Sequence, residues 1–361
     1  MYTLGICAPY SRGEITLGAL RLADLGREMA MNVRFISTGK RQNGVDYVWD
    51  QRVQRSSSKN SYKSLHGCTH FVWFSYEENL YEKCMLVAPK AKHWFVPSSL
   101  TSPSSLTSLK SFARFCNAKG LVCPSRGVKR QLEDILQGAP NPVVTWCLWD
   151  SGWEAILREG LIDANKVSIY VPMLPKTIDQ GGNLVLQAVK EALDLFPEVH
   201  FTLEFHKSWP KSYRKFIRNL QRFDEDRVSV RYLKSFYEQP VMFHSHDWTW
   251  LTDVKSDLGI VAQRSLACGT PVIAYKVSPF VEFVSNENTG MLVPCESSDC
   301  GFSQEIAQPS LVSILSSLAK VITGGEELLA SCQDKMWKRE SQHMQAFKSF
   351  WASEWGLASV K

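Results

Sequence analysis

Five charged side chains follow apolar, strand-like runs of this chain, a position from which side chains can contact a ligand or substrate. In a parallel sheet, ligands bind outside the carboxyl ends of the strands, so side chains placed there face a bound molecule. Carboxylates at that edge can exchange protons, and cations can neutralise an anion such as phosphate. The carboxylates are Glu77, Glu78 and Asp257, and the cations are Lys176 and Lys207.

The two glutamates also have a structural interpretation. Glu77 and Glu78 come directly after the apolar run at residues 69–75, where the next helix would begin. Carboxylates are favourable in the first turn of a helix because they complement its dipole. The sequence leaves the catalytic and the structural interpretation open.

The turn Asp257-Leu258-Gly259-Ile260 is predicted to bind an anion through its backbone. The apolar spacing of residues 260–267 predicts a helix. Amides at a helix N-terminus carry the positive end of its dipole, and Gly259 lets a ligand approach the backbone closely. Such a site needs no particular side chain.

A repeated strand–helix–strand pattern positions these residues. Apolar runs at 248–252 and 271–275 flank the predicted helix, and a similar series begins at Leu4. This alternation predicts an α/β fold with parallel sheets. Because another series begins at Val167 and the chain has 361 residues, two domains are expected.

Part of the chain resembles the retaining glycosyltransferase family 4. The segments LACGTPVIA at 266–274 and NTGMLVP at 288–294 match its motif, and Glu282 stands at the glutamate of its Pro-Glu pair. The resemblance implies the GT-B fold, an α/β architecture with two Rossmann-like domains facing each other across a cleft. It implies an acceptor-side domain at 1–155, a donor domain at 156–330, and a C-terminal helix at 331–361 that crosses back to the first domain.

The resemblance further implies a nucleotide-diphosphate sugar as donor substrate, with no cofactor and no metal. Its catalytic residues would be Asp257, Glu77 and Glu78. The donor-binding residues would be Lys176, Lys207, Ser256, Asp257, Leu258, Gly259, Ile260, Arg264 and Glu282. Residues on the acceptor side would be Ser11, Arg12, Gly13, Tyr76 and Ser125.

The chain departs from the family at four positions. The two signature glutamates fall on Ser256 and Arg264, and the two basic residues of the diphosphate loop fall on Met173 and Gly181. A guanidinium has only donors, so Arg264 cannot accept a bond from ribose, but it could grip a phosphate with two bonds. Two functional classes therefore remain: an active glycosyltransferase, and a catalytically degenerate GT-B-fold binding or partner module.

The acceptor is not named by the sequence. The segment 40–63 carries basic residues interleaved with Tyr47, Trp49 and Tyr62, which fits either a solvated loop or a patch that follows phosphates. A modified base in nucleic acid, a glycan and a lipid are the candidate acceptors. The basic helix predicted at 211–222 is expected to keep its charges in solvent.

Composition places the chain among globular proteins of the cytoplasm. It is 44% hydrophobic and 21% charged, with a formal net charge of +5. The ten cysteines include no C-x-x-C pair and are predicted to be reduced, mostly buried thiols. We identify no secretory signal and no apolar run of the roughly 20 residues that span a bilayer. His244 and His246 have no third ligand at a suitable spacing, so no metal site is expected there. The sequence does not determine the oligomeric state.

Overall fold

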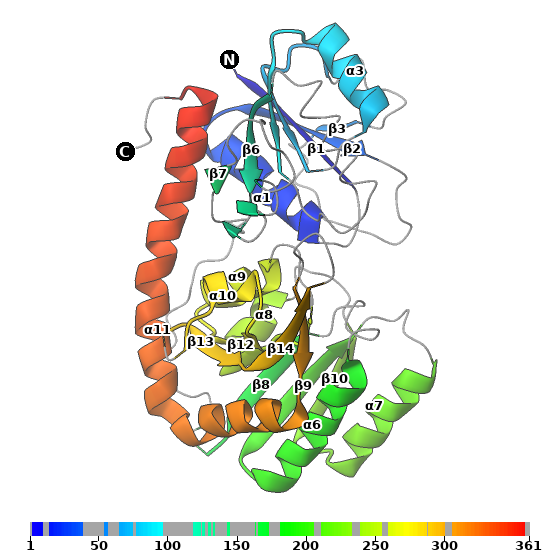
Figure 1. Cartoon of the computed structure of the whole chain (residues 1–361), viewed down its shortest axis with the longest axis vertical. Helices are drawn as coiled ribbons and strands as arrows, with labels where there is room; N and C mark the ends of the chain where they lie inside the picture. Colours follow the sequence, from blue (N-terminus) through cyan, green and yellow to red (C-terminus); the bar gives the residue numbers. More distant parts are fainter. Residues whose placement is uncertain are drawn as a thin grey trace. The chain divides into compact units, whose positions relative to one another are not determined.

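The computed structural model describes residues 2–9, 14–38, 54–56, 65–74, 77–96, 118–123, 125–126, 129–130, 133, 143–144, 163, 165–172, 181–205, 211–232, 239–254, 259–286, 288–299 and 305–357. Contacts divide the chain into two compact units. Unit 1 comprises Met1–Gly152 and Gln342–Lys361, and unit 2 comprises Trp153–Ser341. Each unit contains its own parallel sheet (Figure 1).

Unit 1 is built on a seven-stranded parallel sheet with strand order β3-β2-β1-β4-β5-β6-β7. Two helices described in full connect its strands, α1 and α3. The elements are β1 (Thr3–Pro9), α1 (Glu14–Glu28), β2 (Asn32–Thr38), β3 (Gln54–Ser56), β4 (His70–Trp73), α3 (Glu78–Val87), β5 (Lys92–Phe95), β6 (Ala118–Cys123) and β7 (Val143–Val144).

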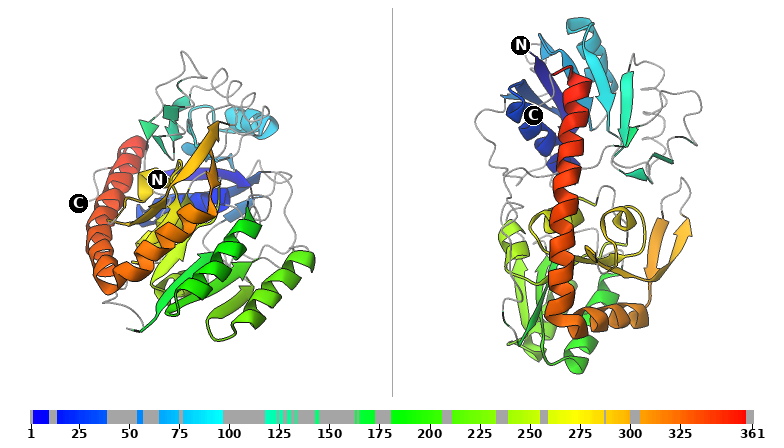
Figure 2. Two further views of the ribbon diagram at one scale, coloured as in Figure 1. Left: turned by 60° about the horizontal axis from the view of Figure 1, so that its bottom comes forward. Right: turned by 90° about the vertical axis from the view of Figure 1, so that its left-hand side faces the viewer.

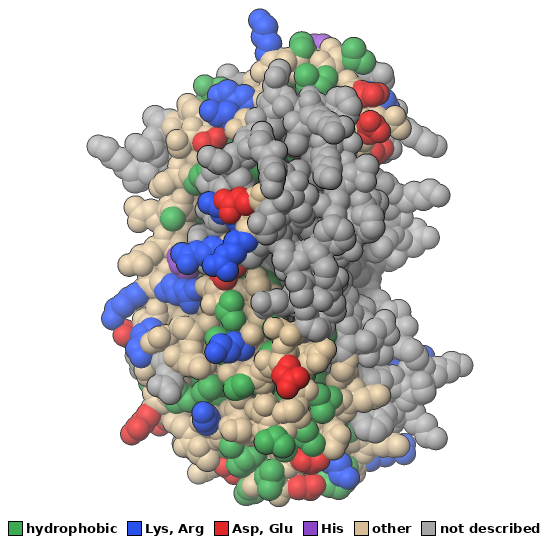
Figure 3. Space-filling view, in the orientation of Figure 1, with side chains coloured by type: hydrophobic (Ala, Val, Ile, Leu, Met, Phe, Trp, Pro, Cys, Tyr) green, Lys and Arg blue, Asp and Glu red, His purple; other side chains and the backbone are tan. Residues whose placement is uncertain are grey.

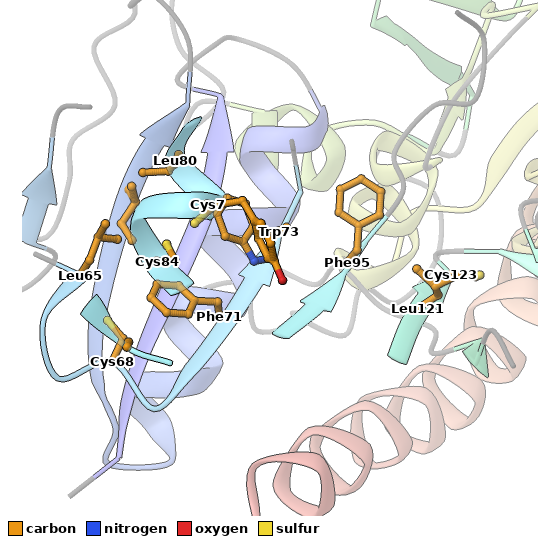
Figure 4. Packing of buried hydrophobic residues seen from close by; sticks show 13 residues of the cluster. Cys7, Leu65, Cys68, Phe71, Trp73, Leu80, Cys84, Phe95, Leu121 and Cys123 are labelled. Atoms are coloured by element: carbon orange, nitrogen blue, oxygen red, sulfur yellow. The ribbon is translucent and has the colours of Figure 1, made fainter. Parts of the chain in front are cut away.

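The core of unit 1 joins its strands to α3. Phe71 and Trp73 of β4 pack with Leu80 and Cys84 of α3 (Figure 4). All four side chains are buried, because β4 is apolar on both faces and α3 presents its apolar stripe to the sheet. Described cysteines are free thiols and all but Cys295 are buried, as predicted.

Unit 2 is built on a six-stranded parallel sheet with strand order β10-β9-β8-β11-β12-β13. Helices α6 and α7 lie side by side (Figures 1 and 2). The elements are β8 (Val167–Pro172), α6 (Gly182–Leu195), β9 (Val199–Phe205), α7 (Lys211–Phe223), β10 (Val228–Tyr232), α8 (Gln239–His244), β11 (Trp248–Trp250), α9 (Ile260–Ala267), β12 (Val272–Tyr275), α10 (Phe280–Phe283) and β13 (Gly290–Val293).

A hairpin and a long helix complete the chain. The hairpin pairs β14 (Cys295–Asp299) with β15 (Glu305–Pro309) in antiparallel register. Helix α11 (Leu311–Trp355) is bent at Gly325, whose φ of 48° and ψ of −138° are not helical (Figure 2). On the face in Figure 3, basic side chains gather over α11. None of the described helices is long and apolar enough to cross a membrane.

The structure confirms the predicted α/β class and the parallel sheets. It places α9 at Ile260–Ala267, the bounds that apolar spacing predicts. The short strand β3 and the hairpin β14–β15 were not predicted, because neither segment shows the apolar alternation of a half-buried strand.

Candidate functional site

The topology of unit 2 identifies one edge of its sheet as the place for a ligand. The strand order runs outward from β8 in one direction and from β11 in the other, so the chain reverses direction between these two strands. In open α/β sheets, ligands bind outside the carboxyl ends of the strands at this switch point. Thr252 stands two residues after the end of β11 at that edge, and α9 begins at Ile260.

Helix α9 begins with a backbone conformation that requires glycine. Gly259 is its N-cap, with φ of 61° and ψ of 27°. A Cβ atom at this position would lie 2.9 Å from Cε2 of Phe283 and 3.2 Å from Cγ of Pro279. Gly259 therefore satisfies both the left-handed backbone and the close packing of α10. The first amides of α9, at Ile260 and beyond, form the kind of helix end that binds anions.

The hydroxyl of Thr252 is a polar group that sequence reasoning missed. Its side chain is buried, and among the described residues its Oγ1 has no hydrogen-bond partner. Buried hydroxyls are usually satisfied, so a lone one at a switch point marks a place where a ligand could bind. A threonine two residues after the buried strand β11 was the signal available in the sequence.

Arg264 lies in the core of unit 2. Its side chain is 3% exposed, and its Nη1 donates to Oε1 of Gln239 at 3.0 Å. Gln239 is fully buried and is the first residue of α8. The guanidinium thus joins α9 to α8. The expectation that Arg264 contacts a phosphate stays a prediction.

A buried carboxylate accompanies this arginine. Glu204 of β9 is 5% exposed and pairs in register with Pro172 of β8 and Arg231 of β10. Burial raises the pKa of Tyr170 well above its ordinary value, and the negative charge of the nearby Glu204 carboxylate raises it further. The positive charges of Arg264 and Arg231 act to lower the pKa of Tyr170. The sequence offers a signal for Glu204, because it is the only acidic residue of the mostly apolar strand β9.

His246, just before β11, has a structural role. His246 donates from Nδ1 to the carbonyl of Met242 at 2.7 Å, and its Nε2 accepts from Oγ1 of Thr202 at 2.7 Å. Asp247 accepts from the amide of Ser168 at 2.8 Å. Within the described part of the chain, no cluster of three or more His, Cys, Asp or Glu side chains could hold a metal ion.

In unit 1, the candidate carboxylates stand at the equivalent switch point, between β1 and β4. Glu77 is the N-cap residue of α3 and Glu78 occupies its first turn, as the structural interpretation predicted. Oε2 of Glu77 is buried with no hydrogen-bond partner among the described residues. This carboxylate adds to the effect of burial in raising the pKa of Cys7, at the end of β1. The catalytic role of Glu77 and Glu78 stays a prediction.

The other predicted site residues are divided by what the structure describes. Ser125 is fully buried after β6. Glu282 lies half-buried in α10, where its carbonyl accepts a bond from Arg339. The remaining ones lie outside the described residues: Ser11, Arg12, Gly13, Tyr76, Lys176, Lys207, Ser256, Asp257 and Leu258.

Comparison with solved structures decides the fold. Anabaena Alr3699/HepE in complex with UDP and glucose superposes with a TM-score of 0.69 at 14% identity, over 99% of this chain and 100% of that one. The pneumococcal O-GlcNAc transferase GtfA in complex with UDP and GlcNAc gives 0.71 at 11% identity, over 98% of each chain. The chain has the GT-B fold.

A third structure and one family model extend the comparison. A glycosyltransferase from Rickettsia africae superposes with a TM-score of 0.69 at 13% identity, over 98% of this chain and 97% of that one. Residues 159–308 match the family described as "Glycosyl transferases group 1". This matched range includes the switch point of unit 2, helix α9, and the buried residues Glu204 and Arg264. No curated protein sequence matches the chain significantly.

Proposed function

We propose that this protein is a glycosyltransferase that moves a sugar from a nucleoside-diphosphate sugar to an acceptor hydroxyl, with retention of the anomeric configuration. The match of residues 159–308 to the glycosyl transferases group 1 carries the proposal. Structures of the same fold were solved with UDP and glucose and with UDP and GlcNAc, which favours a UDP-sugar as the donor.

The donor site proposed here lies at the carboxyl edge of the unit 2 sheet. The amides at Gly259 and Ile260 and the helix dipole of α9 would stabilise the diphosphate. The buried hydroxyl of Thr252 provides a further polar group at this edge. Lys176 and Lys207 are the cations proposed to neutralise charge on the leaving nucleotide, and Ser256, Asp257, Leu258 and Glu282 complete the proposed donor contacts.

The proposed carboxylates are Asp257, Glu77 and Glu78. One oxygen of Glu77 is buried at the switch point of unit 1 with no hydrogen bond from a described residue. A carboxylate in that state is able to accept a proton or orient an acceptor hydroxyl.

Calorimetry with UDP, UDP-glucose and UDP-GlcNAc tests the donor. We expect binding of at least one UDP-sugar, and slow release of UDP from it in the presence of water or an added acceptor. An unchanged sugar nucleotide together with tight binding would identify a binding module. The absence of any binding to a panel of nucleotide sugars would refute the proposed donor.

A second candidate is a catalytically degenerate GT-B-fold binding module. The observation that favours it is the buried Arg264, at the position where the resembling family has a glutamate. The turnover measurement above discriminates the two, since a binding module releases no UDP.

The acceptor is proposed from charge. The basic residues Lys40, Arg41, Arg52, Arg55, Lys59 and Lys63 favour a modified base in nucleic acid, and a glycan or lipid is the alternative. Protein neutralised at these six positions should bind DNA more weakly and with a shallower salt dependence. If that variant binds DNA as tightly as the parent, or if the parent does not bind DNA, a nucleic-acid acceptor is refuted. A glycan or a lipid would then remain as the acceptor.

A further inference from the structure

Two opposite charges are buried in unit 2 beside the candidate donor site. Glu204 is 5% exposed and Arg264 is 3% exposed. Removing a charge from water costs free energy unless other polar groups replace the water. A buried guanidinium and a buried carboxylate in one cluster are therefore expected to depend on each other.

Four elements contribute to this cluster, which we define as Tyr170, Glu204, Gln239 and Arg264. Tyr170 comes from β8, Glu204 from β9, Gln239 from the start of α8 and Arg264 from α9. Nη1 of Arg264 lies 3.0 Å from Oε1 of Gln239, and the Glu204 carboxylate is near enough to Tyr170 to raise the pKa of its hydroxyl. The positive charge of Arg264 acts to lower the pKa of Tyr170, against the larger effect of burial. The cluster thus brings together residues from two helices and from the neighbouring strands β8 and β9.

The position of Arg264 in α9 allows its contacts to fix the orientation of the helix N-terminus. Arg264 follows Gly259 by five residues, roughly 7–8 Å along the helix axis. A helix of only eight residues moves as one body, so a tie at its fifth residue fixes the direction of its first amides. Gly259 itself is confined by Phe283 and Pro279. The two constraints together determine where the N-terminal amides point.

We infer that Arg264 is a positioning residue for the donor site: through its hydrogen bond to Gln239 it holds α9 so that the N-terminal amides of α9 face the diphosphate. The inference rests on the proposed function. In this arrangement the guanidinium is engaged within the core, and the backbone of α9 is what contacts the phosphates. Gln239 is then as important to donor binding as Arg264, although it is fully buried.

Affinity for UDP and for uridine, measured on Gln239→Ala, Arg264→Met and the double variant, tests this inference. Calorimetry is performed far below the unfolding temperature of each variant, and affinity is expressed per folded molecule. Each single variant should bind UDP about tenfold more weakly, and the double variant no more weakly than the worse single one. Uridine affinity should change little. Arg218→Met, on the exposed side of α7, is the control and should bind UDP like the parent.

The outcomes are separable. If Arg264→Met weakens UDP binding while Gln239→Ala does not, Arg264 is a phosphate ligand and the inference is overturned. If both variants unfold at lower temperature but bind UDP normally, the cluster is only structural and the inference is again overturned. Should Arg264→Met fail to fold, Gln239→Ala and Gln239→Leu carry the same test. Failure of the parent to bind UDP or any UDP-sugar refutes the proposed function itself.

Discussion

At the scale of single residues, Gly259 is the position where geometry leaves the least choice. Its φ is 61°, and an added Cβ would lie 2.9 Å from the ring of Phe283. We expect Gly259→Ala to lower the free energy of unfolding by roughly 2–4 kcal/mol, from backbone strain plus the steric conflict. Urea unfolding and UDP affinity measure the effect on stability and on the site.

A matched glycine separates the two causes. Gly181 is also a helix N-cap in unit 2 with positive φ, but no atom of the described residues lies within 4 Å of its hypothetical Cβ. Gly181→Ala should therefore cost only the strain, roughly 1 kcal/mol. Equal losses for the two variants would show that packing against Phe283 has no effect.

Two buried histidines predict how stability depends on pH. Burial lowers the pKa of both His70 and His93 to about 4, with the charge of Lys92 contributing at His70. Their pKa in an unfolded chain is about 6.5. Between these values the unfolded chain binds protons that the folded chain excludes, so the free energy of unfolding should fall as pH drops from about 6.5 to about 4.

The variant His93→Gln tests the contribution of one ring. Its amide oxygen can still accept the bond that Nε1 of Trp73 donates to His93 at 3.1 Å. Stability profiles of parent and variant, measured by urea unfolding from pH 7 to pH 4, should diverge below about pH 6.5, with the variant less sensitive to acid. Parallel profiles would show that His93 titrates normally.

At the scale of elements, strands β8 and β11 are tied by one side chain at the amino edge of the sheet. The carboxylate of Asp247 accepts from the Ser168 amide at 2.8 Å, and the Asp247 amide donates to the Ser168 hydroxyl at 2.9 Å. Asp247 is 1% exposed. Asp247→Ala should cost roughly 2–3 kcal/mol in unfolding free energy, because it leaves buried donors unsatisfied.

Asp247→Asn is the conservative comparison for this tie. Its side-chain oxygen can still accept the Ser168 amide, so the loss should be roughly 1 kcal/mol. A larger loss for asparagine than for alanine would contradict the assigned hydrogen bonds. Both values come from urea unfolding at neutral pH.

Local pattern predicted the elements of the parallel sheets well, for a physical reason. Buried parallel strands are continuous apolar runs, and helices such as α9 end at Gly and Pro signals, both readable within ten residues. The hairpin β14–β15 is polar, and Ala307 of β15 donates its amide to Val254, more than fifty residues away, at 3.0 Å. Partners this distant leave no local pattern.

The candidate site was predicted less completely than the fold. Gly259 was found because its conformational role shows in the sequence. The motif position of Arg264 predicts a phosphate contact, which stays a prediction, and the structure adds a buried partner for its guanidinium, Gln239. Motif position fixes where a Cα lies, whereas the direction of a long side chain depends on which partners other elements bring to it.

At the scale of the whole molecule, the end of α11 is part of the core of unit 1. Trp351 and Trp355 are almost fully buried, and Trp94 of β5 donates from Nε1 to Glu354 at 3.0 Å. Lys348 lies 3.0 Å from Glu28, which also binds the buried Arg21 of α1. The sheet of unit 1 thus depends on residues more than 200 positions further along the chain.

Truncation after Ser341 should therefore unfold unit 1 while leaving unit 2 folded. Losing a buried aromatic side chain typically costs about 3–5 kcal/mol, and the truncation removes Phe347, Trp351 and Trp355 together. Their sum reaches the total stability of an ordinary domain. Hydrogen exchange followed by mass spectrometry should show loss of amide protection in β1, β4 and β5 and retained protection in β8, β9 and β11. Truncation after Leu357, which spares all three aromatic residues, is the control and should match the parent. Protection of β1, β4 and β5 that survives removal of residues 342–361 would show that unit 1 folds without α11.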